Sequence, residues 1–198
     1  MKDPAKSKSR LDYSVPMEIK KRLVVKLFKN TLDSLIAATK ITKANEEIVV
    51  LTNNCQISKL AYNKNINTIS DNNAKSLSQS LQVAAEWAEE NKFSNMCIIP
   101  ADFADPSMED LVKFLSYPVK NNTLVICPSY DLGTNAMFVS PPTLINFMYG
   151  KKSFLRHIEA ANNAGIDPIV LPLDSLRFDV DTIDDFRELF KKKPNIIE

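Results

Sequence analysis

The sequence predicts an α/β protein with an open, mostly parallel sheet and helices on both faces. Three observations predict this fold class. Short runs of β-branched and apolar residues alternate with longer stretches in which apolar residues recur at helical spacing. Proline, glycine or polar turn residues separate the two patterns. The 198 residues are enough to bury one hydrophobic core and too few for two ordinary domains, so residues 1–198 are expected to form a single domain.

Helices are expected where apolar side chains repeat every three or four residues and so line one face. In order, they are 16–38, 56–63, 74–91, a segment after Ser107, a short stretch at 141–149, 153–164 and 182–190. Ser107 and Thr182 are each followed three residues later by an aspartate, Asp110 and Asp185, which is typical of a helix start.

Strands are expected between these helices, where short apolar runs end at turn residues. They are 48–52, 66–69, 96–99, 124–127, 136–139, 169–171 and 177–180. In such a sheet, ligands collect beyond the carboxyl ends of the strands.

The composition excludes several classes of protein. Lysine and arginine number 25 against 24 aspartates and glutamates, so no overall basic field favours nucleic acid or a membrane surface. No apolar run reaches the length of a membrane span, and the basic start has no apolar region after it. The three cysteines are far apart and lack metal-ligand spacing. A cytoplasmic protein is expected.

Three acidic residues follow predicted strands and are candidate metal ligands. Asp102 comes shortly after 96–99, and Asp179 and Asp181 lie at the end of 177–180. In an extended chain, carboxylates two residues apart point to the same side, and hard oxygen ligands suit Mg²⁺ beside substrate phosphates. The alternative is that all three are solvated turn or cap residues.

A second group of residues is suited to binding an anion. Gly133, Thr134 and Asn135 lie at the end of a turn-rich stretch, and Gly150 precedes a helix that begins near Ser153. Glycine allows close approach of backbone N–H groups, and a helix N-terminus attracts negative charge. Alternatively, Ser153 is an ordinary N-cap. His157 lies on the same helix face as Ser153, and no catalytic step is assigned to it.

The basic start of the chain is a candidate nucleotide-binding segment. Lys2, Lys8 and Arg10 precede the first helix. Positioned cations stabilise the charge of a triphosphate during phosphoryl-type transfer. The alternative is a solvated chain end.

Together these segments resemble the 2-phospho-L-lactate guanylyltransferases of coenzyme F-420 biosynthesis, which are nucleotidyltransferases of the MobA-like type. The matching stretches cover almost the whole chain: KSRL at 8–11, PAD at 100–102, EDL at 109–111, GTNA at 133–136, Gly150 with Ser153, Phe154 and His157, and 179–182 with Asp185. Ser78 stands where the family tends to carry asparagine in its base-recognition region. The family's first strand, which precedes the basic segment, is not found, so the expected domain lacks it.

The resemblance implies a Rossmann-like fold similar to that of nucleotide-diphospho-sugar transferases. It implies that the phosphate of 2-phospholactate attacks the α-phosphorus of GTP and releases pyrophosphate; related members use phosphoenolpyruvate or 3-phosphoglycerate. Asp102, Asp179 and Asp181 would hold Mg²⁺ as the catalytic group. Thr134, Gly150 and Ser153 would bind the phospho-acid, and Lys2, Lys8 and Arg10 the nucleotide. The implied enzyme needs no nucleic acid or membrane partner and could form a homodimer.

Two alternatives remain open from the sequence. The first is another nucleotidyltransferase or glycosyltransferase on the same fold, because fold alone does not fix chemistry. The second is a non-catalytic nucleotide-binding protein.

Overall fold

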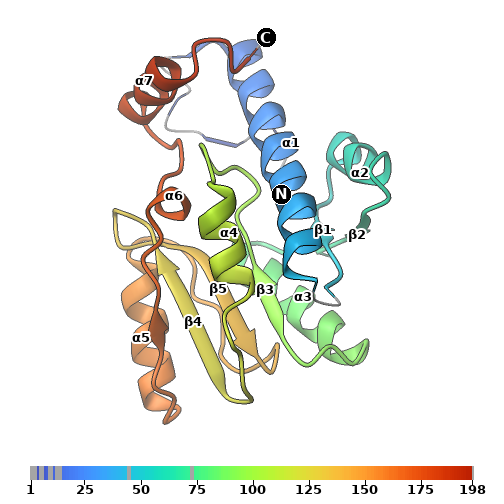
Figure 1. The fold of residues 1–198 in the computed structure, drawn as a ribbon, viewed down its shortest axis with the longest axis vertical. Coiled ribbons are helices and arrows are strands. Elements are labelled where there is room, and N and C mark those ends of the chain that lie inside the picture. The colour runs from blue at the N-terminus through green and yellow to red at the C-terminus, as the bar shows by residue number, and fades with distance from the viewer. Residues whose placement is uncertain are drawn as a thin grey trace.

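The computed structural model describes residues 4, 7, 8, 11, 15–43, 46–71 and 74–197 (Figure 1). Its helices are α1 (Met17–Thr42), α2 (Cys55–Tyr62), α3 (Leu77–Glu90), α4 (Met108–Leu115), α5 (Ser153–Asn163), α6 (Asp174–Arg177) and α7 (Ile183–Lys192). Its strands are β1 (Val49–Leu51), β2 (Asn67–Ile69), β3 (Met96–Ile98), β4 (Thr123–Pro128), β5 (Thr134–Ser140) and β6 (Ile169–Val170). The predicted α/β class is confirmed.

The larger sheet has four strands in the order β3-β5-β4-β6. β5 runs antiparallel to both of its neighbours, and β4 is parallel to β6. It follows that β3, β4 and β6 share one direction and that β5 opposes them. β1 and β2 form a separate parallel pair. Three of the four strands of the larger sheet therefore run in one direction, and β5 is the exception, because the short β4–β5 turn can only join antiparallel strands. Since β5 lies between β3 and β4, two of the three pairings in this sheet are antiparallel.

Alternation along β4 places helices on both faces of this sheet. Val125 and Cys127 are buried in a cluster with α4 and α6. Leu124 and Ile126 are buried in a second cluster with α3 and α5. Figure 1 shows α1 beside α4 in front of the sheet. Because side chains alternate between the two faces of a strand, both faces of a central strand must be apolar to bury two helix layers.

Helix starts follow the predicted capping signals. Ser107 Oγ accepts a hydrogen bond from the backbone N–H of Asp110 at 3.1 Å. Thr182 and Asp185 form a reciprocal capping box at the start of α7. The longest helix, α1, has 26 residues but carries several charged ones. In the part of the chain that the structure describes, no helix has the length and apolar character needed to cross a membrane.

The predicted helix at 141–149 is wrong. The segment is a series of turns and irregular backbone that begins with a cis Ser140–Pro141 peptide bond. Two adjacent prolines remove two backbone donors. The N–H groups of Met148 and Tyr149 donate to side chains, His157 Nε2 at 2.8 Å and Ser78 Oγ at 2.8 Å, instead of to helical carbonyls.

The predicted strand at 177–180 is also largely wrong. Residues up to Arg177 belong to the short helix α6, and only one isolated antiparallel bridge remains, between Asp179 and Phe103. Arg177 ends α6 and Thr182 already caps α7, so too few extended residues remain between them for a ladder. The bridge nevertheless fixes the position of Asp179.

Replacing Phe114 with alanine should destabilise the protein strongly. Phe114 lies on α4 with no exposed surface, in the cluster that covers the front of the sheet. Truncating a fully buried phenylalanine costs about 3–5 kcal/mol through lost transfer energy and the remaining cavity. Urea denaturation measures this loss, and Met108→Ala, at a partly exposed position on the same helix, serves as the control. A loss for Phe114→Ala as small as for the control would contradict the packing described.

Candidate active site

Three carboxylates are brought together where the loop after β3 meets the segment after α6. The bridge between Phe103 and Asp179 joins the two segments, and Ala104 N–H donates to the carbonyl of Phe178 at 3.4 Å. Asp102 precedes the bridge on one side and Asp181 follows it on the other. Asp102 and Asp179, which are 77 positions apart in the sequence, therefore lie close to each other in the fold.

Lys8 lies among these carboxylates. Its Nζ is 2.7 Å from Asp102 Oδ2 and 3.5 Å from Asp181 Oδ1, and its side chain is only 2% exposed. The approach to Asp102 is an ion pair that is not aligned as a hydrogen bond. Lys8 adopts a positive φ of 54°, and its carbonyl accepts from the N–H of Leu11, which is fully buried. Leu11 thus anchors the turn that presents Lys8.

The electrostatics of this group show excess negative charge. Burial alone would lower the pKa of Lys8, but the nearby carboxylates of Asp102, Asp181 and Asp179 outweigh it and raise that pKa above its usual value. Burial, followed by the charge of Asp181, raises the pKa of Asp179 to about 7, and Lys8 opposes this increase. One buried ammonium therefore does not neutralise three carboxylates.

This donor set fits a divalent cation. Hard carboxylate oxygens are the ligands that Mg²⁺ prefers, and the ammonium of Lys8 already stands in for a cation among them. Within the described residues, no three acidic, histidine or cysteine side chains converge closely enough to hold a metal as they stand. Asp102, Asp179 and Asp181 are the residues whose carboxylates would hold such an ion.

A second polar group is buried where β5 meets α5. Ser153 Oγ donates to Thr134 Oγ1 at 3.2 Å, and Thr134 Oγ1 lies 2.9 Å from His157 Nδ1. Thr134 is 7% exposed, Ser153 1% and His157 0%. Burial of a polar side chain is favourable only with partners, and these three provide them for one another. The structure thus brings two predicted site residues, Thr134 and Ser153, into direct contact, and it adds His157, to which the sequence assigned no step, as a second partner of Thr134.

Ser153 does not act as a helix cap. The N-cap of α5 is Lys152, without a side-chain hydrogen bond, and the Ser153 hydroxyl points to Thr134 instead. Gly150 adopts φ +124° and its carbonyl accepts from Ser153 N–H at 3.0 Å. Because an L side chain rarely adopts that φ, glycine is favoured at the turn that leads into α5. The alternative of an ordinary cap at Ser153 is therefore excluded.

The two polar groups are linked through the turn between β4 and β5. The guanidinium of Arg177 lies 4.4 Å from the centre of the Tyr130 ring, and Asn135 Nδ2 donates to the carbonyl of Leu176 at 2.9 Å. Asp131 lies near enough to contribute to the raised pKa of Asp179. This turn therefore lies against the segment that carries the carboxylates. Asn135 was grouped with Gly133 and Thr134 from the sequence but was given no role, and the structure shows it as a positioning residue that ties β5 to α6.

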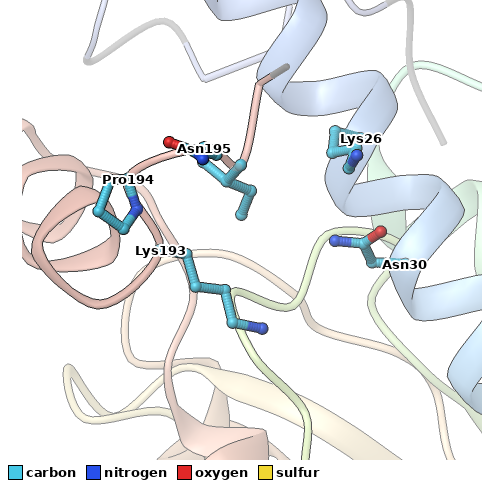
Figure 2. A pocket seen from close by; sticks show the side chains of 6 residues that line it. Lys26, Asn30, Lys193, Pro194 and Asn195 are labelled. Carbon is cyan, nitrogen blue, oxygen red and sulfur yellow. The ribbon is translucent and has the colours of Figure 1, made fainter.

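Other residues lie outside these two groups. Lys2 and Arg10 lie outside the described residues, so the structure places only Lys8 of the predicted nucleotide-binding segment. Asp105 forms an ion pair with Lys193 and takes no part in the acidic group. Figure 2 shows a hollow between α1 and the segment after α7, lined by Lys26, Asn30, Lys193, Pro194, Asn195 and Ile196. None of these six residues belongs to the candidate site.

The fold is an open α/β fold that is also found in a solved nucleotide-handling enzyme. The whole chain superposes on a solved structure described as a nucleotide-diphospho-sugar transferase from Desulfovibrio desulfuricans G20, with a TM-score of 0.73 over 94% of that chain. At 15% sequence identity this likeness shows the fold.

The chain belongs to the family described as "Guanylyl transferase CofC like", whose model matches residues 1–193, and it is therefore a nucleotidyltransferase. It is 32% identical to the 3-phospho-D-glycerate guanylyltransferase of Colwellia psychrerythraea, over 96% of this chain and 88% of that protein. It is 27% identical to the 2-phospho-L-lactate guanylyltransferase of Methanocaldococcus jannaschii, over 92% and 76%. It is 25% identical to the phosphoenolpyruvate guanylyltransferase of Chloroflexus aggregans, over 92% and 90%.

Proposed function

We propose that the protein joins the guanylyl group of GTP to the phosphate of a small phospho-acid and releases pyrophosphate. The acceptor is 2-phospho-L-lactate, phosphoenolpyruvate or 3-phosphoglycerate, and the reaction belongs to coenzyme F-420 biosynthesis in the cytoplasm. One observation carries this proposal. A cluster of carboxylates around Lys8 and a pair of hydroxyl residues, Thr134 and Ser153, lie on either side of the turn between β4 and β5. The names of relatives that act on these three acids support the acceptor class.

The reaction joins two anions, so neutralising charge is the main task of the site. An oxygen of the acceptor phosphate bonds to the α-phosphorus of GTP, the bond from that phosphorus to the bridging oxygen breaks, and its electron pair leaves with pyrophosphate. A phosphate monoester is already a nucleophile near neutral pH, so no general base is required. Positioning and electrostatic stabilisation are then sufficient sources of catalysis.

In this proposal the acidic group serves the nucleotide. Bound Mg²⁺ would supply positive charge at the α-phosphate and at the leaving pyrophosphate. Asp102, Asp179 and Asp181 would hold that ion by their carboxylate oxygens. The ammonium of Lys8, buried among these carboxylates, is a second positive charge at the same place.

The hydroxyl-bearing residues Thr134 and Ser153 serve the phospho-acid in this proposal. Thr134 offers a hydroxyl hydrogen bond to the acid, and Ser153 supports it by donating its own hydroxyl proton to Thr134. The turn at Gly150 leads into the N-terminus of α5, whose dipole favours an anion, although the N–H groups of Ser153 and Phe154 already donate to backbone carbonyls. The Thr134 hydroxyl is a neutral donor. It binds an anion without cancelling the charge that makes its phosphate nucleophilic.

A panel of substrates tests the function directly. The protein is incubated with each of the three phospho-acids, with GTP or ATP, and with Mg²⁺ or a chelator, while pyrophosphate release is followed. We expect release with GTP, Mg²⁺ and at least one acid, and none with chelator. Turnover with a sugar acceptor and with none of the three acids would reject the proposal in favour of a glycosyltransferase. GTP binding without turnover would favour a non-catalytic binding protein.

Ser153→Ala should raise KM for the phospho-acid by about tenfold, because it removes the hydrogen bond that orients the Thr134 hydroxyl, and the bond from that hydroxyl to a charged group contributes about 1.5–3 kcal/mol. KM for GTP should stay within about twofold, since Ser153 has no contact with the acidic group. Steady-state kinetics with each substrate varied in turn measure both values. Ser140→Ala, a buried serine at the far end of β5 that donates to the carbonyl of Ser94, is the matched control. An unchanged KM for the acid would remove Ser153 from the site.

A further inference from the structure

His157 is fully buried in α5, and both of its ring nitrogens have a partner. Nε2 lies 2.8 Å from the backbone nitrogen of Met148, and Nδ1 lies 2.9 Å from Thr134 Oγ1. The edge of the ring also meets Tyr149, with ring centres 5.1 Å apart. The imidazole is therefore held in one orientation by three residues from two other segments of the chain.

The partner of Nε2 fixes which nitrogen carries the proton. A backbone N–H can only donate, so Nε2 must accept through its lone pair and must be unprotonated. In the neutral ring the proton then lies on Nδ1, and Nδ1–H donates to Thr134 Oγ1. Burial, with a smaller contribution from Arg156, lowers the pKa of His157 to about 4, which agrees with a ring that stays neutral at physiological pH.

This assignment uses up the accepting capacity of Thr134. A hydroxyl accepts two hydrogen bonds and donates one. Thr134 Oγ1 accepts from His157 Nδ1–H and from Ser153 Oγ–H. Its own proton remains, and Thr134 is the first residue of β5, directly after the turn that lies against the carboxylate segment. No acceptor for that proton occurs among the contacts of the described residues.

We infer that His157 is a positioning residue that makes the Thr134 hydroxyl a dedicated donor to an anionic oxygen of the phospho-acid. The hydrogen-bond chain runs one way, from Met148 N–H through the imidazole to Thr134 and out to the ligand. Hydrogen bonds in such a chain polarise one another. Because Thr134 cannot accept a further bond, it selects an oxygen without a proton, as in a phosphate or carboxylate. This inference rests on the proposed function for the identity of the ligand, but not for the state of the ring.

A structural role for His157 is the competing explanation. Its contact with Met148 also fixes the segment that leads to Gly150, as the Ser78 contact with Tyr149 does. The two roles depend on different nitrogens. A pair of variants can therefore separate them.

His157→Asn and His157→Gln form this matched pair. The asparagine amide places an N–H near the position of Nδ1 and so keeps the donor to Thr134, while it loses the acceptor for Met148. The glutamine amide reaches the position of Nε2 and so keeps the acceptor for Met148, while it loses the donor. We expect His157→Gln to raise KM for the most active acid of the panel by about tenfold or more, and His157→Asn by less than about threefold. KM for GTP should be unchanged in both.

Nitrogen NMR of the wild-type ring tests the inference without any substitution. The chain has one histidine, so the two ring nitrogen signals belong to His157. We expect a protonated Nδ1 and a bare Nε2, unchanged between pH 8 and pH 5.5. A proton on Nε2, or a charged ring in this range, would overturn the inference whether or not the protein turns over any substrate.

The kinetic outcomes also distinguish a failure of the role inferred for His157 from a failure of the proposed function. If His157→Asn loses affinity for the acid as much as His157→Gln does, the ring is structural and the inference fails while the proposed function stands. If no phospho-acid supports turnover in the wild type, the proposed function fails, and the NMR result alone decides the state of the ring.

Discussion

Asp181→Ala is expected to lower guanylyl transfer by at least about a hundredfold, the scale of effect seen when one group that stabilises transition-state charge is removed. The Asp181 carboxylate lies 3.5 Å from Lys8 Nζ and is half exposed, so it faces the site instead of the core. Its backbone N–H donates to Asp185 Oδ2 at 3.1 Å, a contact that alanine preserves. Pyrophosphate release across a range of Mg²⁺ concentrations measures the loss.

The fold should survive this change, because the raised pKa of Asp179 comes partly from the charge of Asp181, and alanine removes that repulsion. We expect a melting temperature close to that of the wild type or slightly above it. Asp184→Ala is the matched control, since Asp184 lies three residues away, is 85% exposed and pairs only with Arg187 among the contacts described. Turnover of Asp181→Ala within about threefold of this control would remove Asp181 from the proposed mechanism.

Lys8→Met is expected to destabilise the free protein and to make its stability depend on Mg²⁺. The change removes a buried ammonium from beside Asp102, Asp179 and Asp181 and leaves their charge without it. Removing one partner of a fully buried ion pair costs about 3–5 kcal/mol. Here Asp102 is 33% and Asp181 46% exposed, so solvent reduces the loss to about 2 kcal/mol. Melting temperature should fall by about 4–8 °C for a chain of this size.

Added Mg²⁺ should recover much of that loss in Lys8→Met and change the wild type less, because the ion then replaces the missing positive charge. Lys64→Met is the control: Lys64 pairs with Asp33 at the surface, where such pairs contribute about 0–1 kcal/mol. Thermal melts of the three proteins with and without Mg²⁺ provide the comparison. A melting temperature for Lys8→Met that equals that of the control, in the absence of metal, would show that Lys8 is not the counter-ion of the carboxylates.

The elements that could be predicted from the sequence are those governed by local patterns. α3 and α5 follow their apolar periodicity, and Thr182 with Asp185 marks the start of α7. The segment 141–149 could not be predicted, because its backbone donors are taken by the side chains of His157 and Ser78, from other parts of the chain. The direction of β5 likewise depends on the hairpin turn, and it is the one strand of the larger sheet that opposes the others.

In the candidate site, too, some features could be predicted from the sequence and others could not. Asp102 and the pair Asp179 and Asp181 were placed together because each follows an apolar run, although Asp179 is held by one isolated bridge and not by a strand. The hydrogen bond from Ser153 to Thr134 could not be predicted, since a serine at a helix start more commonly caps it. Their catalytic and binding roles remain predictions.

Phosphorus NMR of the completed reaction tests most directly whether this protein joins a nucleotide to a phospho-acid. With GTP, Mg²⁺ and the best acid of the panel, we predict loss of the GTP signals, growth of pyrophosphate, and a pair of mutually coupled signals from the new unsymmetrical diphosphate. The acid's own phosphate signal should disappear in step with them. Formation of GDP and inorganic phosphate with the phospho-acid left intact would contradict the account.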